Sequence, residues 1–290
     1  MQIELLRNHG RGSTKVNHLP FIQGALVVNV KSAGYFAPDS IVARLHADPA
    51  LIVGGIRALL EQALHPGAMA GVAKYSDFRD DAWGRLRRTG EYVALVTYGS
   101  RDEVDSAAER VRTIHHRLGL DNQEELLWVH TSMVDAFIDV ARRSGMSLSD
   151  REIDDYLEQM VTFAELVGIK RGSVPATYQE LQSYMEDIQP RLAASEEAKR
   201  TSVFLAFPPM APIIRFATPA PALWVSVATL AAASLPRWAR DMYGWPNFPG
   251  QERITDRALV AFRDNALRLP EVMRLSPYVR AKRAEATSAS

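Results

Sequence analysis

The chain of 290 residues contains no cysteine. This absence excludes disulfides, iron–sulfur clusters, zinc–thiolate sites, cysteine nucleophiles and a haem held by a thiolate. A haem in this protein would therefore need histidine, tyrosine or methionine as its axial ligand. The cellular compartment stays open, because a chain without cysteine is compatible with an oxidising or a reducing environment.

An excess of charge of one sign is also missing. Lys and Arg together number 34, and so do Asp and Glu. Global charge thus favours no nucleic-acid partner, and we expect none. The chain also has no Gly-rich phosphate loop, no G-x-S-x-G elbow, no HExxH and no pair of Glu-x-x-His motifs of the kind that binds two irons.

Long hydrophobic runs are scarce. Residues 1–34 scatter their basic side chains and have no apolar core before a cleavage site, so we expect no signal peptide and a cytoplasmic protein. Residues 216–236 carry no charge, but prolines interrupt their start and leave 222–235 as the clean apolar helix. Fourteen residues fall short of the roughly 20 that cross a bilayer, so we expect a buried core helix. Membrane contact is the alternative, which we do not favour.

Apolar residues recur at helical spacing along most of the chain, and strand patterns are few. The sequence therefore predicts an all-α, single-domain bundle: an irregular N-terminal arm at 1–48, a helical catalytic domain at 49–285 and a disordered tail at 286–290. Helix-capping residues together with glycine and proline predict helices at about 49–64, 66–75, 80–98, 104–118, 123–144, 149–167, 175–188, 222–235 and 255–269.

Several polar residues of the stretch 60–120 sit where a ligand could be held. Arg85 and Thr89 are four residues apart and share one face of their helix. On the helix 104–118 the apolar stripe places His115 on the buried side and leaves His116 nearer the rim. A cationic cluster beside an inward-facing imidazole suits an anionic cofactor that carries a metal.

The same stretch resembles a known family. Its blocks read HP, GVA-x-YS, RLRRT-x-x-Y, RVR-x-IHHRLG and LLWVH in this order, and the likeness continues more weakly to about residue 280. In that order they are similar to the rubber oxygenase (latex-clearing protein) and MpaB-type oxygenase family. The resemblance implies a globin-like core, a haem b (iron) held by one proximal histidine, and cleavage of carbon–carbon double bonds with oxygen.

The resemblance also suggests roles for individual residues. His115 occupies the position of the ligand histidine, and we expect it to bind the iron. Arg85 and Thr89 match an Arg-x-x-x-Thr signature beside the haem, so Arg85 would pair with a propionate and Thr89 would position oxygen or a water. His116 points about 100° away from His115, which suits solvent exposure or a propionate contact. His130 matches a further block, and we expect it to line the pocket.

Two departures from the family pattern affect the expected chemistry. Rubber oxygenases often have a lysine just before the threonine that can occupy the distal site, whereas this chain has Arg88, which stays protonated and cannot ligate iron. We expect Arg88 to contact the cofactor instead. The acidic base of those enzymes has no clear counterpart between His65 and Arg85, where only Asp77, Asp80 and Asp81 occur, so rubber cleavage itself is not expected.

The leading hypothesis is a haem-dependent oxygenase that uses oxygen or peroxide on an apolar, isoprenoid- or polyketide-like small molecule. A cofactor-free helical protein that binds an apolar small molecule, and a dehydrogenating or cyclising enzyme of the same fold, remain open. So do structural roles for the histidines, with His65 the strongest such case, and a non-haem iron held by His65, His115 and His130.

Overall fold

The structure is a computed structural model of the chain and describes residues 34–75, 82–275 and 277–288. Every regular element in these residues is a helix. The first half contains α1 (Ile41–His46), α2 (Leu51–Gln62), α3 (Pro66–Tyr75), α4 (Ala82–Tyr98), α5 (Arg101–Leu118), α6 (Gln123–Arg143) and α7 (Asp150–Leu166). The second half contains η1 (Arg171–Ser173), α8 (Tyr178–Ile188), η2 (Gln189–Arg191), α9 (Glu196–Ala206), α10 (Pro212–Ala217), α11 (Ala220–Ser234), α12 (Arg237–Tyr243), α13 (Gln251–Leu267), α14 (Glu271–Arg274) and α15 (Pro277–Ser288). The predicted all-α fold is confirmed.

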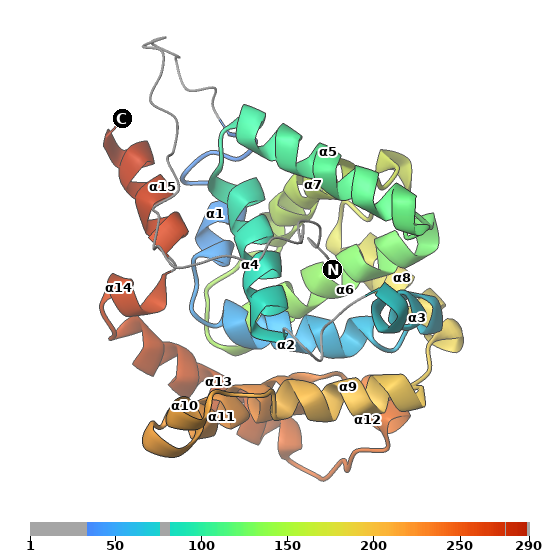
Figure 1. Cartoon of the computed structure of the whole chain (residues 1–290), viewed down its shortest axis with the longest axis vertical. Coiled ribbons are helices and arrows are strands. Elements are labelled where there is room, and N and C mark those ends of the chain that lie inside the picture. The colour runs from blue at the N-terminus through green and yellow to red at the C-terminus, as the bar shows by residue number, and fades with distance from the viewer. Residues whose placement is uncertain (1–33, 76–81, 276, 289–290) are drawn as a thin grey trace, which may run out of the picture.

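Helix α6 lies at the centre of the molecule and packs along α2 over most of its length. Its buried face includes Trp128 and Ile138, both essentially inaccessible to solvent. Figure 1 shows α9 and α11–α13 as a layer beneath α2, while α5 runs along the opposite side with α4 and α7 between. Helix α6 therefore has one side toward α2 and the lower layer and another toward α4, α5 and α7.

Local signals in the sequence explain where the site helices begin and end. Ser100 and Ser149 start α5 and α7 with capping boxes, in which the serine and the glutamate three residues later exchange hydrogen bonds with each other's backbone. Helix α5 ends at Gly119, whose φ of 66° is the left-handed conformation that a glycine adopts at little cost. These caps place His115 in the last turn of α5.

The boundaries expected for the ends of the chain need correction. Residues Ile41–His46, assigned to an irregular arm, form α1, and Val42 and Leu45 of this helix are buried in the main core. The prediction of an irregular arm is therefore wrong for this stretch. A short helix can be stabilised by burial against the rest of the fold, which its own sequence does not reveal. At the other end α15 extends to Ser288, inside the tail expected at 286–290. Residues 1–33 and 289–290 lie outside the described part.

Residues 222–234 fall within α11, with Leu235 as its C-cap, and the helix carries the buried side chains Val227, Ala228 and Ala231. Val227 and Ala231 join Val53, Ile56 and Val140 in a second hydrophobic cluster, which packs the lower layer against α2 and α6. The expected helix is present, but it is buried on one side only, since Leu223 is 63% exposed. A search of the described helices finds none that combines the length and the apolar character needed to span a bilayer.

Candidate functional site

The imidazole of His115 is half-buried in the last turn of α5. Its Nδ1 atom is buried and has no hydrogen-bond partner in the structure. Burial lowers the pKa of this imidazole, because a charged ring loses hydration when it leaves water. His115 is therefore held neutral at physiological pH, which is the form of histidine that binds metals.

His116 is placed quite differently although it is the next residue. Its side chain is 86% exposed, and its Nδ1 lies 2.8 Å from Oδ2 of Asp121. Of the two positions considered for His116, the structure places it in solvent. The adjacent histidines thus differ in environment, and only His115 presents a buried nitrogen that lacks a protein partner.

Helix α4 carries the expected cations. Arg85 and Arg88 are both half-buried, one turn apart, whereas the Thr89 side chain is exposed. Burial, and next the positive charge of Arg88, lower the pKa of Arg85 to about 10. An anionic group placed beside these two guanidinium groups would relieve their repulsion. The structure therefore places Arg85 and Arg88 one turn apart on α4, close enough for the charge of Arg88 to lower the pKa of Arg85.

His130 is buried on the side of α6 that faces α7. Its Nδ1 also has no hydrogen-bond partner, and burial lowers its pKa to about 4. Its ring lies 6.1 Å from that of Phe163 on α7, centroid to centroid, and the ring of Tyr92 on α4 meets the same phenylalanine edge-on at 6.1 Å. His130 and Tyr92 thus converge on Phe163 from two different helices.

Buried polar atoms without a hydrogen-bond partner occur on four consecutive helices. They include the Tyr92 hydroxyl of α4, Nδ1 of His115 on α5, Nδ1 of His130 on α6 and Oε1 of Gln159 on α7. Buried polar groups in native proteins normally find partners, so such a group calls for an explanation, such as a missing ligand or water. We take these four residues and the α4 arginine pair as the candidate site.

Further contacts tie the four helices together. Gln159 lies one turn before Phe163 on α7 and so shares its face. Arg112, one turn before His115, donates to the backbone oxygen of Leu166 at 2.8 Å and so joins α5 to the end of α7. The charge of the same arginine acts on Tyr92, whose pKa burial raises to about 12.

Sequence reasoning assigned no role to Tyr92 or Gln159. Tyr92 could have been found, because it lies seven residues after Arg85 and so returns to the same face of α4. Gln159 carries no such signal. It belongs to the site only because α7 packs beside α6.

His65 has a structural role. Its Nδ1 accepts a hydrogen bond from the Ala68 backbone N–H at 3.2 Å, which caps the first turn of α3. The other ring nitrogen, Nε2, lies 3.5 Å from Oε1 of Glu124. In the described part of the chain no three His, Asp or Glu residues gather closely enough to hold a metal ion, so the structure does not support a three-histidine iron site.

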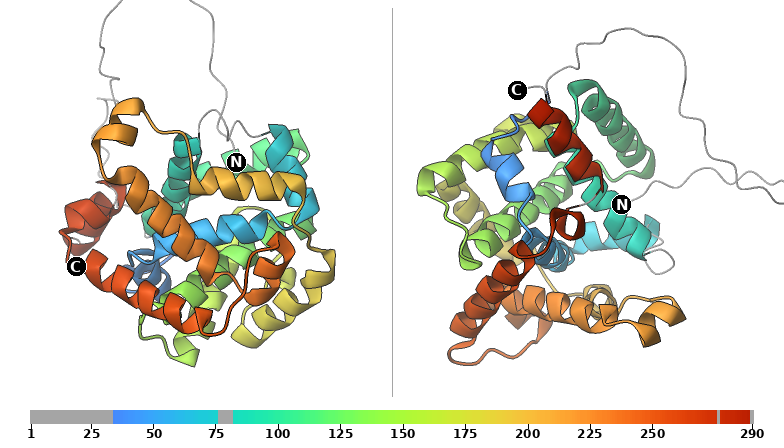
Figure 2. Two further views of the ribbon diagram at one scale, coloured as in Figure 1. Left: turned by 90° about the horizontal axis from the view of Figure 1, so that it is seen from below. Right: turned by 90° about the vertical axis from the view of Figure 1, so that its left-hand side faces the viewer.

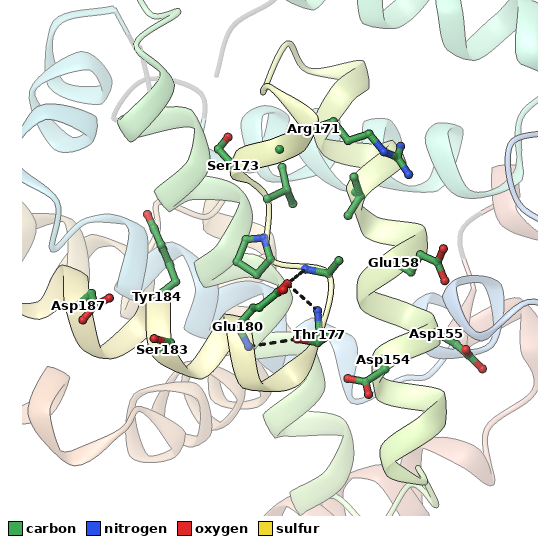
Figure 3. Close-up of a pocket in the computed structure, with 15 residues that line it drawn as sticks. Asp154, Asp155, Glu158, Arg171, Ser173, Thr177, Glu180, Ser183, Tyr184 and Asp187 are labelled. Atoms are coloured by element: carbon green, nitrogen blue, oxygen red, sulfur yellow. Dashed lines mark hydrogen bonds between the residues drawn. The ribbon is translucent and has the colours of Figure 1, made fainter.

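A surface hollow of about 780 Å³ lies elsewhere, between α7 and α8. Figure 3 shows Asp154, Asp155, Glu158 and Asp187 around it, with Glu180 turned toward the backbone before α8. Glu180 and Asp154 accept hydrogen bonds from the backbone N–H groups of Ala176 and Tyr178, both at 2.8 Å. None of the expected site residues lines this hollow.

The described part of the chain is an all-α bundle with buried polar side chains in its interior. The family of the ER-bound oxygenase mpaB/B'/Rubber oxygenase catalytic domain matches residues 43–264, and the chain belongs to this family. The protein is thus an enzyme of the oxygenase kind. Searches of curated proteins and of solved structures gave no significant match.

Proposed function

We propose that this protein is a haem b-dependent oxygenase that uses molecular oxygen or peroxide to oxidise an apolar small molecule of isoprenoid or polyketide type. The observation that carries the proposal is the buried, neutral and unpartnered Nδ1 of His115, in a chain that belongs to an oxygenase family. An iron porphyrin needs only one imidazole from the protein, since the macrocycle supplies four ligands.

Helix α4, which packs against α5, carries cations that suit such a group. Arg85 and Arg88 offer two guanidinium groups to its propionates, which are the carboxylate partners that arginine binds best. Burial of this pair in a low-dielectric region strengthens its attraction for an anion. An iron porphyrin bound here would supply the binding and activation of oxygen, which no side chain of the chain can perform.

The remaining site residues act on the substrate side in this proposal. Phe163 provides an apolar ring against which His130 and Tyr92 are fixed. The Tyr92 hydroxyl stays protonated at neutral pH because its pKa is raised, so it can donate a hydrogen bond. His130 stays neutral and can donate or accept at Nδ1 according to its tautomer. Together they would orient a mostly apolar molecule by a few polar contacts.

We do not propose rubber as the substrate. Arg88 stands where a distal lysine would be expected, and a guanidinium does not ligate iron at neutral pH. The three aspartates that occur between His65 and Arg85 fall at positions 77, 80 and 81, which lie outside the described residues. Thr89 keeps its expected distal role in the proposal, although its side chain is exposed in the structure.

The proposal is tested by an absorption spectrum of the full-length protein after haem supplementation, with iron and haem quantified. We expect a Soret band and one haem per chain for the wild type. His115→Ala should lose the haem, whereas the neighbouring His116→Ala should retain it because that ring points into solvent. A colourless wild type, or a His115→Ala protein that keeps haem normally, would contradict the proposal.

The same preparation separates the alternatives. A cofactor-free binding protein would be colourless and would release apolar material into organic solvent. A dehydrogenating or cyclising enzyme would bind haem but incorporate no labelled oxygen into its product. The proposed oxygenase should transfer label from ¹⁸O₂ or H₂¹⁸O₂.

A further inference from the structure

One surface of the molecule has no role in the site described above. Residues 211–219, APIIRFATP, are exposed without interruption; we name them the apolar ridge. They include Ile213, 72% exposed, and Phe216, 81% exposed. Single exposed apolar residues are ordinary, but a contiguous group of this kind marks an interaction surface.

The ridge stands out from the bundle. It consists of the six-residue helix α10 with a turn on either side, and none of the α10 residues is buried. Among the neighbouring helices α10 packs mainly on α11. Both views of Figure 2 show this segment at an outer edge of the molecule, beyond the ends of α9 and α11. It is a protruding tip.

Charge indicates what kind of partner fits this tip. The stretch 198–240 contains five Lys or Arg residues and no Asp or Glu. Four of these cations pair with the carboxylates of Glu196, Glu197, Asp241 and Glu252, so among the described residues of this stretch Arg215 alone has no ion pair. Arg215 lies on the ridge itself, and its guanidinium carbon is 5.6 Å from the centre of the Phe216 ring. A cation among exposed apolar side chains, with no carboxylate nearby in sequence, complements an anionic lipid surface.

The aromatic base of the ridge supports the same partner. The indole N–H of Trp83 donates to the Pro209 backbone oxygen at 2.6 Å, and its ring packs edge-on against Trp224 at 4.6 Å. Tryptophan is favoured where an apolar layer meets water, because its ring is amphipathic. Trp83 lies in the first turn of α4, the helix that carries Arg85.

A second copy of the chain fits the ridge less well. A stable protein interface takes about 20–30 residues from each partner, far more than the nine of this tip. A bilayer has no such requirement, because binding there depends on the apolar area inserted and on attraction to charged headgroups.

We propose that the apolar ridge docks the protein on an anionic bilayer, with Ile213 and Phe216 inserted among the acyl chains and Arg215 at the headgroups. Docking is independent of haem. Its consequence, that an apolar substrate enters the site from the membrane, rests on the proposed function.

Vesicle co-sedimentation of the full-length protein tests this proposal. We expect the wild type to pellet with phosphatidylcholine vesicles that contain about one third phosphatidylglycerol, and less with phosphatidylcholine alone. Ile213→Ser/Phe216→Ser should weaken binding at least about tenfold, since affinity scales with the apolar area inserted. Arg215→Gln should weaken binding to the anionic vesicles about fivefold, because one basic residue supplies about that much attraction to an anionic surface. Its binding to the neutral vesicles should be unchanged.

Two exposed apolar residues of α14, Val272 and Met273, provide the matched control, and Val272→Ser/Met273→Ser should bind like the wild type. Circular dichroism confirms that each variant is folded. The proposal is overturned if the wild type stays in the supernatant with both vesicles, or if the ridge variant pellets equally well. It is also overturned if sedimentation velocity without lipid shows a dimer that the ridge variant abolishes, because the ridge is then an interface between copies. No readout requires haem or activity, so failure here is distinct from failure of the proposed function.

Discussion

The hydroxyl of Tyr156 lies 3.0 Å from Nε2 of His46 and links α7 to α1 in the core. The other ring nitrogen of His46, Nδ1, lies 2.7 Å from Oγ1 of Thr97. The Thr97 hydroxyl donates its hydrogen to the backbone carbonyl of Val93 at 2.7 Å. Thr97 must therefore accept from the imidazole, and Nε2 must accept from Tyr156. These hydrogen bonds define one tautomer of a neutral His46, with the proton on Nδ1.

Removing the Tyr156 hydroxyl from this hydrogen-bond network should destabilise the fold. Tyr156→Phe leaves the buried Nε2 of His46 without a donor, and we expect the free energy of unfolding to fall by about 1–3 kcal/mol. Urea unfolding measures the change. Tyr35→Phe is the control, because the Tyr35 hydroxyl bonds Asp105 at the surface and its loss should cost less than about 1 kcal/mol. Equal losses for both variants would contradict the assignment.

The contribution of two neutral histidines to stability, the half-buried His46 and the buried His130, should be lost in mild acid. Burial lowers the pKa of His46 to about 3 and that of His130 to about 4, from an ordinary value near 6.5. The unfolded chain binds these protons first, so the stabilising contribution is complete above about pH 6.5 and is lost as pH falls toward the folded values. Each group adds up to about 1.4 kcal/mol per pH unit.

Urea unfolding at several values between pH 7 and pH 5 measures this slope. His130→Gln retains a polar side chain but cannot titrate, so the slope should decrease by the share of one group. An unchanged slope would show that His130 is not buried as described.

The buried ion network beneath α6 should be sensitive to loss of its cation. Arg57 is 2% exposed and donates to Glu61 at 2.8 Å, to Asp135 at 3.1 Å and to Asp139. Arg57→Met leaves these carboxylates without their central partner, and we expect a loss of about 3–5 kcal/mol in urea unfolding. Arg87→Met breaks an exposed pair with Glu91 and should cost less than about 1 kcal/mol. A small loss for Arg57→Met would mean that water reaches the network.

The same network predicts a dependence on alkaline pH. Burial raises the pKa of Glu61 to about 8, and its Oε2 atom has no hydrogen-bond partner. The folded protein therefore retains a proton that the unfolded chain has released above about pH 4.5, so stability declines as pH rises from there toward the folded pKa. Glu61→Gln should remove this decline. The comparison is made by thermal unfolding between pH 6 and pH 9, and parallel curves for both proteins would refute the assignment.

The arginine pair on α4 should matter for haem affinity. Arg85→Ala removes one of two guanidinium groups that we assign to the propionates, and loss of a charged hydrogen bond of about 1.5–3 kcal/mol corresponds to roughly 10–100-fold weaker binding. Haem titration followed at the Soret band gives this number. Arg87→Ala on the exposed face of the same helix should bind haem like the wild type, and equal affinities for both variants would exclude Arg85 as a contact.

Much of the helical framework follows from local patterns. The helices at 66–75 and 123–143 match their expected bounds within a residue, because apolar spacing and capping residues act over one or two turns. The inward direction of His115 was predicted in the same way, from the apolar stripe of α5. The short helix α1 was missed, because six residues do not form a stable helix without the core that they pack against.

The sequence by itself determined that the protein is all-α, where its site helices end, and which of two adjacent histidines turns inward. The start of α5 was missed, because the helix begins at Arg101 and not at the expected residue 104. Tertiary structure alone decided that Arg57 is buried, since its partners Asp135 and Asp139 lie 78 and 82 residues further along the chain. It alone placed Tyr92 and His130 around Phe163, and it alone left α10 outside the bundle. The physical reason is range: turns and caps form between neighbours in sequence, whereas burial and the meeting of distant side chains depend on how whole helices pack.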